Sequence, residues 1–183
     1  MANLYKALRT RIQDLMLGNV GYSGRAFIVG RFKTCPQDKT IETVPENDCE
    51  RAFRVIFTGS EELEAWNSLC DYSLEKAQFE IKVAYQYTKG GMFPDGYEGY
   101  EATQGNGDID ALNDRAMTDA VEIIKILSYH ENFGIIQVSP VVDVFSFHPL
   151  NDNSLDVFKD RAILTVKMEA FYRISTSSSY SGV

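Results

Sequence analysis

The sequence predicts an α+β domain, in which a mainly antiparallel sheet packs against two helices and carries a long glycine-rich excursion. Two segments, residues 4–17 and 110–129, repeat apolar side chains at the spacing of an amphipathic helix. Three others alternate apolar and polar side chains as half-buried strands do: residues 51–58, 76–88 and 162–174. The excursion is residues 89–109, which hold six glycines and Pro94. A stretch of this kind in a compact domain is normally functional or mobile.

The first helix and the segment after it open the domain. Apolar residues recur at helical spacing from Leu4 to Leu17, and the pair Gly18-Asn19 is suited to ending the helix. Residues 25–32 then predict a strand, which would place Phe27 and Val29 on one side of the sheet.

A polar stretch separates this strand from the next. Residues 33–50 contain Pro36 and Pro45, so we expect a loop or a loose hairpin there. Beyond the second strand, Ser60 is a natural helix N-cap, and the glutamates that follow it suit the first turn of a helix. This pattern predicts a short helix over residues 61–70.

The second long helix carries the strongest periodicity in the chain. Asp108, Asp110 and Asp114 suit its first turn, where the helix dipole favours carboxylates. Its apolar face is broad, and Met117 and Val121 extend it. We therefore expect this helix to be covered on two sides.

The last third of the chain returns to strands. Residues 135–147 predict a strand that is broken or bulged near Pro140, and residues 148–160 predict a polar turn with a short helix. After the closing strand, residues 175–183 are rich in serine and read as a flexible tail. The domain organisation is therefore one assembly domain over residues 1–174, followed by that tail.

Composition excludes several classes of protein. The 183 residues, 44% of them apolar, suit one domain with an ordinary core. There is no run of 18 apolar residues, so no membrane span is expected, and the first residues lack the features of a signal peptide. We expect a protein made or assembled inside a cell.

The cysteines show no metal-binding pattern. Cys35, Cys49 and Cys70 form no C-x-x-C pair, so we expect three reduced thiols in preference to a zinc site or a bridge between the first two.

Charge is unevenly distributed along the chain. The net charge of −8 argues against non-specific binding to nucleic acid phosphates. Residues 1–33 carry a net charge of +5, residues 34–88 carry −6 and residues 89–114 carry −5. A positive end and a negative middle can meet on neighbouring copies of one chain, although ordinary solvated faces explain the same pattern.

The sequence carries no motif for catalysis. Its two histidines, His130 and His148, lie outside any recognisable ligand or nucleophile pattern, and there is no G-x-S-x-G or Walker A sequence. The acids from Asp108 to Asp114 do not form an EF-hand, because Leu112 and Asn113 stand where an oxygen ligand and a glycine are required. We expect no catalytic residue, no cofactor and no metal, and therefore a protein that is not an enzyme.

Three segments carry a resemblance to a known family. They are the opening helix Leu4–Leu17, the helix Ala116–Leu127 that runs into strand 135–147, and the closing strand Ile163–Ile174 that ends in Phe171-Tyr172-Arg173. In this layout and in its length the chain resembles the bacteriophage tail terminator or tail-completion proteins.

The resemblance implies a structural virion protein of the tail or neck, assembled in the host cytoplasm. Such a protein would form a homo-hexameric ring that caps the tail-tube protein and meets the head-side connector, while DNA passes through the lumen without specific binding. Aromatic and Met side chains are enriched in interface cores, so the candidate interface residues are Met92, Phe93, Tyr97 and Tyr100. An acidic lining lets DNA slide, and the candidates for the lumen or a neighbour contact are Asp95, Glu98 and Glu101.

Two other functions remain open. A head-closure or neck subunit, or a tail-tube subunit, would share the small ring-forming design. A cone-shaped ligand-binding domain is the alternative from another class, with Asp143 as its one candidate for a buried polar group. The residues that would line its pocket are Phe53, Phe57, Phe79, Tyr85 and Tyr172.

Overall fold

The structure is a computed structural model, and it describes residues 2–19, 26–64, 72–87, 109–129, 137–139, 142–150, 152–158 and 160–175. The helices are α1 (Ala2–Leu17), α2 (Glu46–Cys49) and α3 (Ile109–Leu127). The strands are β1 (Lys33–Thr34), β2 (Ala52–Glu64), β3 (Tyr72–Gln86), β4 (Gln137–Ser139), β5 (Val142–Pro149), β6 (Ser154–Val157) and β7 (Arg161–Ser175). This arrangement confirms the predicted α+β class.

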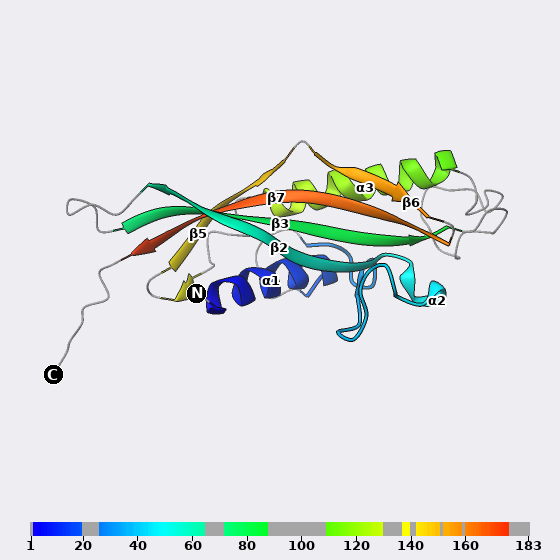
Figure 1. Cartoon of the computed structure of the whole chain (residues 1–183), viewed down its shortest axis with the longest axis horizontal. Coiled ribbons are helices and arrows are strands. Elements are labelled where there is room, and N and C mark those ends of the chain that lie inside the picture. The colour runs from blue at the N-terminus through cyan, green and yellow to red at the C-terminus, as the bar shows by residue number, and fades with distance from the viewer. Residues whose placement is uncertain are drawn as a thin grey trace.

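One mainly antiparallel sheet organises the described residues. Its strand order is β1-β2-β3-β7-β5-β4, and β6 also pairs with β7. The long strands β2, β3 and β7 run side by side along the longest axis of the molecule (Figure 1). β3 occupies one edge of β7 over its whole length, so β6 and β5 share the other edge in succession. The only parallel pair is the short one between β1 and β2 among the described strands.

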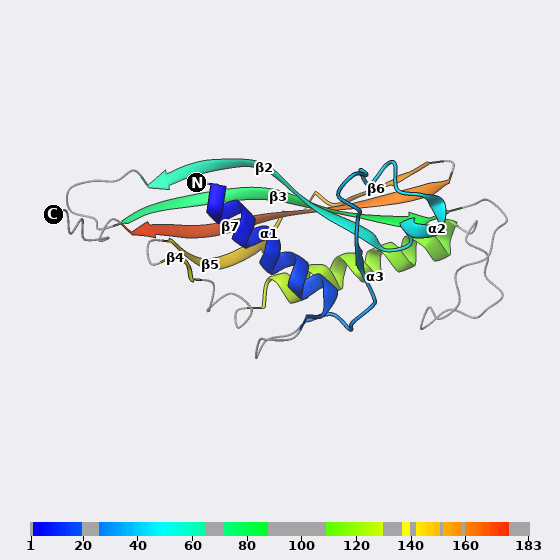
Figure 2. The same cartoon turned by 90° about the horizontal axis from the view of Figure 1, so that it is seen from below.

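Both long helices cover the same face of the sheet. Alternate residues of β3, from Phe79 to Tyr85, point toward this face and are buried with the apolar stripes of α1 and α3. Figure 2 shows α1 crossing the sheet obliquely and α3 running toward the end of the sheet that lies away from the N-terminus. The sequence predicted these stripes correctly, because both helices and β3 follow a regular apolar period.

The opposite face is covered at one end by residues 35–50. Ile41, Val44 and Cys49 pack there against Ala84 and against the other small or apolar residues of that face. Arg161 fastens the segment, since its Nη1 donates hydrogen bonds to the carbonyl oxygens of Ile41 (3.3 Å) and Val44 (2.8 Å). The predicted loop is therefore ordered by a second small core.

The end of α1 follows the sequence prediction closely. Gly18 adopts a left-handed conformation with φ of 71°, and the amide of Asn19 donates to the carbonyl oxygen of Asp14 (3.0 Å). The Gly18 amide donates to the carbonyl oxygen of Leu15 (3.3 Å). These two bonds make a Schellman motif, which needs a residue without a side chain at the left-handed position.

The strand predicted over residues 25–32 is wrong for its described part. Residues 26–32 form no strand, and the strand begins only at Lys33. A turn intervenes, in which the Arg31 amide donates to the carbonyl oxygen of Ile28 (3.1 Å) and Gly30 takes φ of 86°. This turn leaves Ile28 and Val29 exposed, although Phe27 is buried as expected.

The short helix predicted over residues 61–70 is wrong for residues 61–64, which continue β2. Its cap residue, Ser60, pairs with Ala77 of β3, and Lys76 bridges Glu61 (3.0 Å) and Glu169 (3.1 Å). Glu61, one of the acids that suggested a helical first turn, therefore serves a strand instead, because cross-strand pairing supplies Lys76 as its partner.

Of two predictions near the C-terminal end, one is confirmed and one is wrong. The strand predicted over residues 135–147 is broken near Pro140, as expected, and its described part is two strands, β4 and β5, which pair antiparallel with each other. A proline cannot donate to a sheet ladder, which is why the sequence predicts a break at this position. The short helix predicted within residues 148–160 is the strand β6, because residues 154–157 pair with β7.

Candidate functional site

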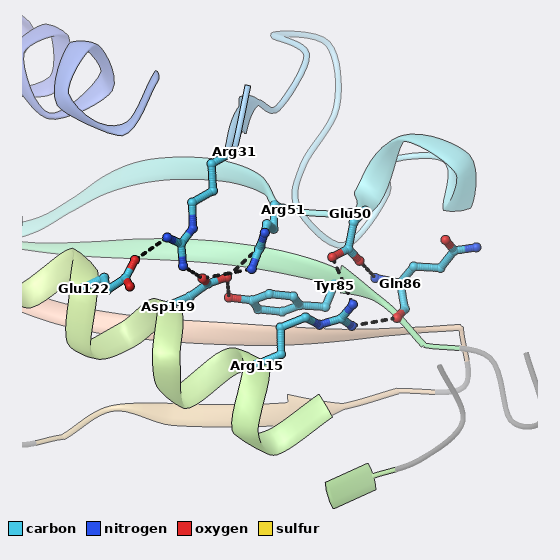
Figure 3. Close-up of polar contacts among 8 residues, drawn as sticks. All are labelled: Arg31, Glu50, Arg51, Tyr85, Gln86, Arg115, Asp119 and Glu122. Atoms are coloured by element: carbon cyan, nitrogen blue, oxygen red, sulfur yellow. Dashed lines mark hydrogen bonds and ion pairs between the residues drawn. The ribbon is translucent and has the colours of Figure 1, made fainter. Parts of the chain in front are cut away.

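A cluster of polar and charged side chains lies between α3 and the sheet (Figure 3). We call it the α3 network. It draws on α3, on β3, on the turn before β1 and on the residues between α2 and β2. Its members are Arg31, Glu50, Arg51, Tyr85, Gln86, Arg115, Asp119 and Glu122.

Asp119 is the centre of the α3 network. Its carboxylate is 0% exposed and accepts four hydrogen bonds. Arg31 donates one through Nη2 (2.7 Å), and Arg51 donates two, through Nε (2.8 Å) and Nη2 (3.1 Å). The Tyr85 hydroxyl donates the fourth (2.9 Å). A carboxylate has about four acceptor positions, so Asp119 is fully occupied.

Arg51 reaches Asp119 from an uncommon backbone conformation. Its φ is 53°, the only positive value at a non-glycine position within the described residues. The left-handed region costs an L-residue roughly 1–2 kcal/mol. The two charge-assisted bonds from Arg51 to Asp119 offset this strain, because bonds of this kind are about twice as strong as neutral ones.

Arg115 forms the second half of the α3 network. Its side chain is 1% exposed and lies one turn before Asp119 on α3. It pairs with Glu50 (Nη1 to Oε1, 3.2 Å) and donates to the carbonyl oxygen of Gln86 (3.4 Å). The backbone amide of Gln86 in turn donates to Glu50 (2.9 Å). The Arg115 guanidinium also lies 5.3 Å from the centre of the Tyr85 ring, within cation–π range.

The charges of the α3 network are balanced. Three arginines face three carboxylates, with Arg31 also pairing with Glu122. Burial, and after it the charge of Asp119, raises the pKa of Tyr85 well above its usual range, so its hydroxyl keeps its proton at neutral pH. Burial also raises the pKa of Glu50, against the opposing effect of Arg115.

This arrangement suits a scaffold better than a reaction centre. A general base must be able to accept a proton from a substrate, but the acceptor positions of Asp119 are taken by neighbouring side chains. Its removal from solvent also leaves no room for a reacting group beside it. The α3 network therefore fixes α3, the turn at residues 28–31 and the start of β2 against one another.

Sequence reasoning missed the α3 network. The signal was the spacing of Arg115 and Asp119, which share a helical face with Leu112 and Ile123. A charged residue in the middle of an apolar face needs a buried partner. The partners themselves had no signal, because nothing in the spacing of Arg31 or Arg51 points to α3.

The residues predicted as functional lie elsewhere. The candidate interface residues Met92, Phe93, Tyr97 and Tyr100 and the candidate acidic contacts Asp95, Glu98 and Glu101 fall within residues 88–108, outside the described residues. The serine-rich tail after Ser175 also lies outside them. These predictions stay predictions.

The aromatic residues of the ligand-pocket alternative belong to the main core. Phe53, Phe79, Tyr85 and Tyr172 are buried in it, and Phe57 packs against it with its ring 6.0 Å from that of Phe79. The Tyr172 hydroxyl donates to Glu75 (2.5 Å), as that of Tyr85 does to Asp119. Asp143 stands in β5 opposite Arg173 of β7, and its side chain lies outside the described part.

The two described cysteines carry free thiols and differ in burial. Cys49 is fully buried and Cys35 is partly exposed. Burial raises the pKa of the Cys49 thiol to about 11, and it also raises that of Cys35. Only the thiolate is nucleophilic, so the higher pKa lowers the thiolate fraction of Cys49 roughly a hundredfold near neutral pH.

We expect iodoacetamide at pH 8 to modify Cys35 well before Cys49 in the native protein. Mass spectrometry of the separated peptides reads each site, and the protein in urea is the control, in which both should react alike. Equal rates in the native state would contradict the burial of Cys49.

The same pKa shift predicts an effect on stability. Since the Cys49 thiol ionises at lower pH in the unfolded chain, Cys49 should make the protein less stable as pH rises from about 9 to about 11.

Three further observations concern metal binding, membrane insertion and the second histidine. Among the described residues, no three His, Cys, Asp or Glu side chains gather as a metal site requires. Within the same ranges, no helix is both long and apolar enough to span a bilayer. His148 lies edge-on to Phe171, with ring centres 5.2 Å apart. Neither a protein-family model nor a curated protein sequence matches this chain.

Proposed function

We propose that this chain is a structural virion protein, a tail terminator whose copies close into a ring. The ring, a hexamer in the simplest form, would cap the tail-tube protein and join it to the head-side connector, with DNA passing through the lumen. The virion tail or neck would be its location. Support comes from the fold class and from the α3 network, whose buried acid Asp119 is occupied by arginines and a tyrosine and is suited to rigidity.

The observation that carries the proposal is the long edge of β2. Among the described residues, β2 pairs on its outer side only through Ala52 and Phe53, which meet β1. Residues 54–64 continue as a strand with β3 on the inner side alone. A row of backbone donors and acceptors on such an edge is a template for a strand of another chain.

The opposite side of the sheet offers a second, different edge. β6 pairs with β7 on one side, and Val157 and Phe158 are exposed at its end. Within the described residues no further strand lies beyond β6. Two unlike surfaces on opposite sides of a subunit are what a head-to-tail contact needs, and such contacts generate closed rings when the rotation closes.

Electron microscopy of the purified protein tests this proposal. We expect single closed rings, and we expect them to cap isolated tail tubes. Long filaments would identify a tail-tube subunit instead, and rings that bind the head-side connector but not the tube would favour a neck subunit. A protein that stays a monomer at every concentration would overturn the proposal.

A substitution on the β2 edge sharpens the experiment. Thr58 is exposed beyond the part of β2 that pairs with β1, and a lysine on an edge strand blocks pairing with another strand. We expect Thr58→Lys to abolish rings. Thr10→Lys is the matched control, because Thr10 is an exposed threonine on α1. Rings that survive Thr58→Lys would show that β2 is not the contact.

A further inference from the structure

The outward face of α3 carries apolar side chains that the described residues leave uncovered. Met117 is 61% exposed and Val121 is 44% exposed, and they lie one helical turn apart. Both stand on the side of α3 opposite the buried stripe of Leu112, Ala116 and Ile123. The helix is therefore apolar on two sides, but the prediction that both sides are covered is wrong for a single copy of the chain, because Met117 and Val121 are exposed.

Charged residues flank this pair along the same face. Asp114 is exposed about one turn before Met117 and Asp110 about two turns before it, while Lys125 is exposed about one turn beyond Val121. We call the set the outer stripe: Asp110, Asp114, Met117, Val121 and Lys125. It has an acidic end, an apolar middle and a basic end.

We propose that the outer stripe binds the outer stripe of a second copy of this chain, with the two α3 helices antiparallel about a two-fold axis near residue 119. A two-fold contact uses the same surface on both partners, so the stripe must be complementary to itself. In this register Met117 of one copy meets Val121 of the partner subunit.

The charges select the antiparallel arrangement. With the axis near residue 119, Asp114 of each copy lies opposite Lys125 of the partner subunit, within about one residue or ~1.5 Å along the axis. The two-fold repeats this pair, so each dimer gains it twice. A parallel arrangement would instead place Asp114 beside Asp114 and Lys125 beside Lys125, where like charges repel.

The inference does not depend on the proposed function. A ring uses two unlike surfaces, whereas this contact uses one surface twice, so a dimer through α3 stands whether or not rings form. The outer stripe is also separate from the edge of β2, because α3 packs on one face of the sheet and not along its edges.

Sedimentation equilibrium over a range of concentrations is the first test. We expect a reversible dimer, and we expect Val121→Glu to weaken it about a hundredfold by placing a charge in the apolar centre. The variant should stay folded, because a glutamate four residues before Lys125 is a favourable helical pair. Val29→Glu is the control, since Val29 is also an exposed valine, 72% exposed in the turn before β1, and lies on neither proposed contact surface.

Charge reversal is the second test. Asp114→Lys alone and Lys125→Asp alone should each weaken the dimer about tenfold, because each creates two like-charge contacts. A mixture of the two single variants should dimerise as tightly as the native chain, since both contacts are then restored between unlike partners. Circular dichroism of each variant confirms that the helix persists.

Each outcome decides the inference. A dimer lost in Val121→Glu and recovered in the mixture supports it. A native chain that is monomeric throughout, or an oligomer that Val121→Glu leaves unchanged, overturns it. Rings that are lost in Thr58→Lys, from a native chain that shows no dimer sensitive to Val121→Glu, would contradict the α3 contact and leave the ring proposal intact. A dimer without rings would do the reverse.

Discussion

Replacing Asp119 with alanine is expected to lower the free energy of unfolding by about 3–5 kcal/mol. The side chain is 0% exposed and holds Arg31, Arg51 and the Tyr85 hydroxyl. Its removal leaves two guanidinium groups and a phenol in a buried site without the acceptor that compensates their desolvation. Losing one partner of a buried ion pair costs more than the pair contributes, because the surviving charge stays out of water.

Urea unfolding measures the change, with circular dichroism as the readout. Asp119→Asn keeps one oxygen acceptor and the shape of the side chain, so we expect it to lose less stability than Asp119→Ala. Asp156→Ala is the control, because Asp156 is an exposed aspartate on β6 and its loss should stay within about 0.5 kcal/mol. An Asp119→Ala protein as stable as the control would show that the α3 network does not fix the helix.

Replacing Gly18 with alanine should cost about 2–5 kcal/mol. Two effects combine. The left-handed φ of 71° costs an alanine roughly 1–2 kcal/mol, and a Cβ built on Gly18 would lie only 2.3 Å from the Phe27 carbonyl oxygen. Forcing atoms into an occupied space costs a further ~1–3 kcal/mol, because the backbone there must shift.

Gly30→Ala separates the two effects. Gly30 also has a positive φ, of 86°, but a Cβ there would meet nothing within 4 Å. We expect Gly30→Ala to show the conformational cost alone, so that the difference between the two variants in thermal unfolding measures the clash with Phe27. If both variants lost the same stability, the close approach of α1 to the segment after it would be absent in solution.

The elements that the sequence predicted well are those whose own residues decide their structure. β3 alternates without interruption from Phe79 to Tyr85, and the Gly18-Asn19 pair contains the whole chemistry of a helix end. Prediction failed for segments whose local structure is decided by a partner elsewhere in the chain. Ser60 and the glutamates after it can begin a helix or continue a strand, and the pairing with β3 selects the strand.

Only the α3 residues of the α3 network could be predicted from the sequence. Arg115 and Asp119 interrupt the apolar face of a strongly periodic helix, and this indicates that something polar must meet them inside the core. Which residues do so depends on the tertiary fold. Arg51 reaches its position through a left-handed backbone and Arg31 through a turn, and neither conformation follows from the residues around them.

The place of β7 in the sheet has a consequence for the order of synthesis. It follows every other described strand, yet β3 pairs with it over its full length, so the paired residues lie from 75 positions apart (Gln86 and Arg161) to 103 positions apart (Tyr72 and Ser175). Until β7 has been synthesised, the edge of β3 that pairs with it is open, and α3 lacks part of the apolar sheet surface on which it packs. We expect nascent chains that end before residue 160 to be sensitive to proteases and to recruit chaperones, and maturation to follow only on release of the closing segment.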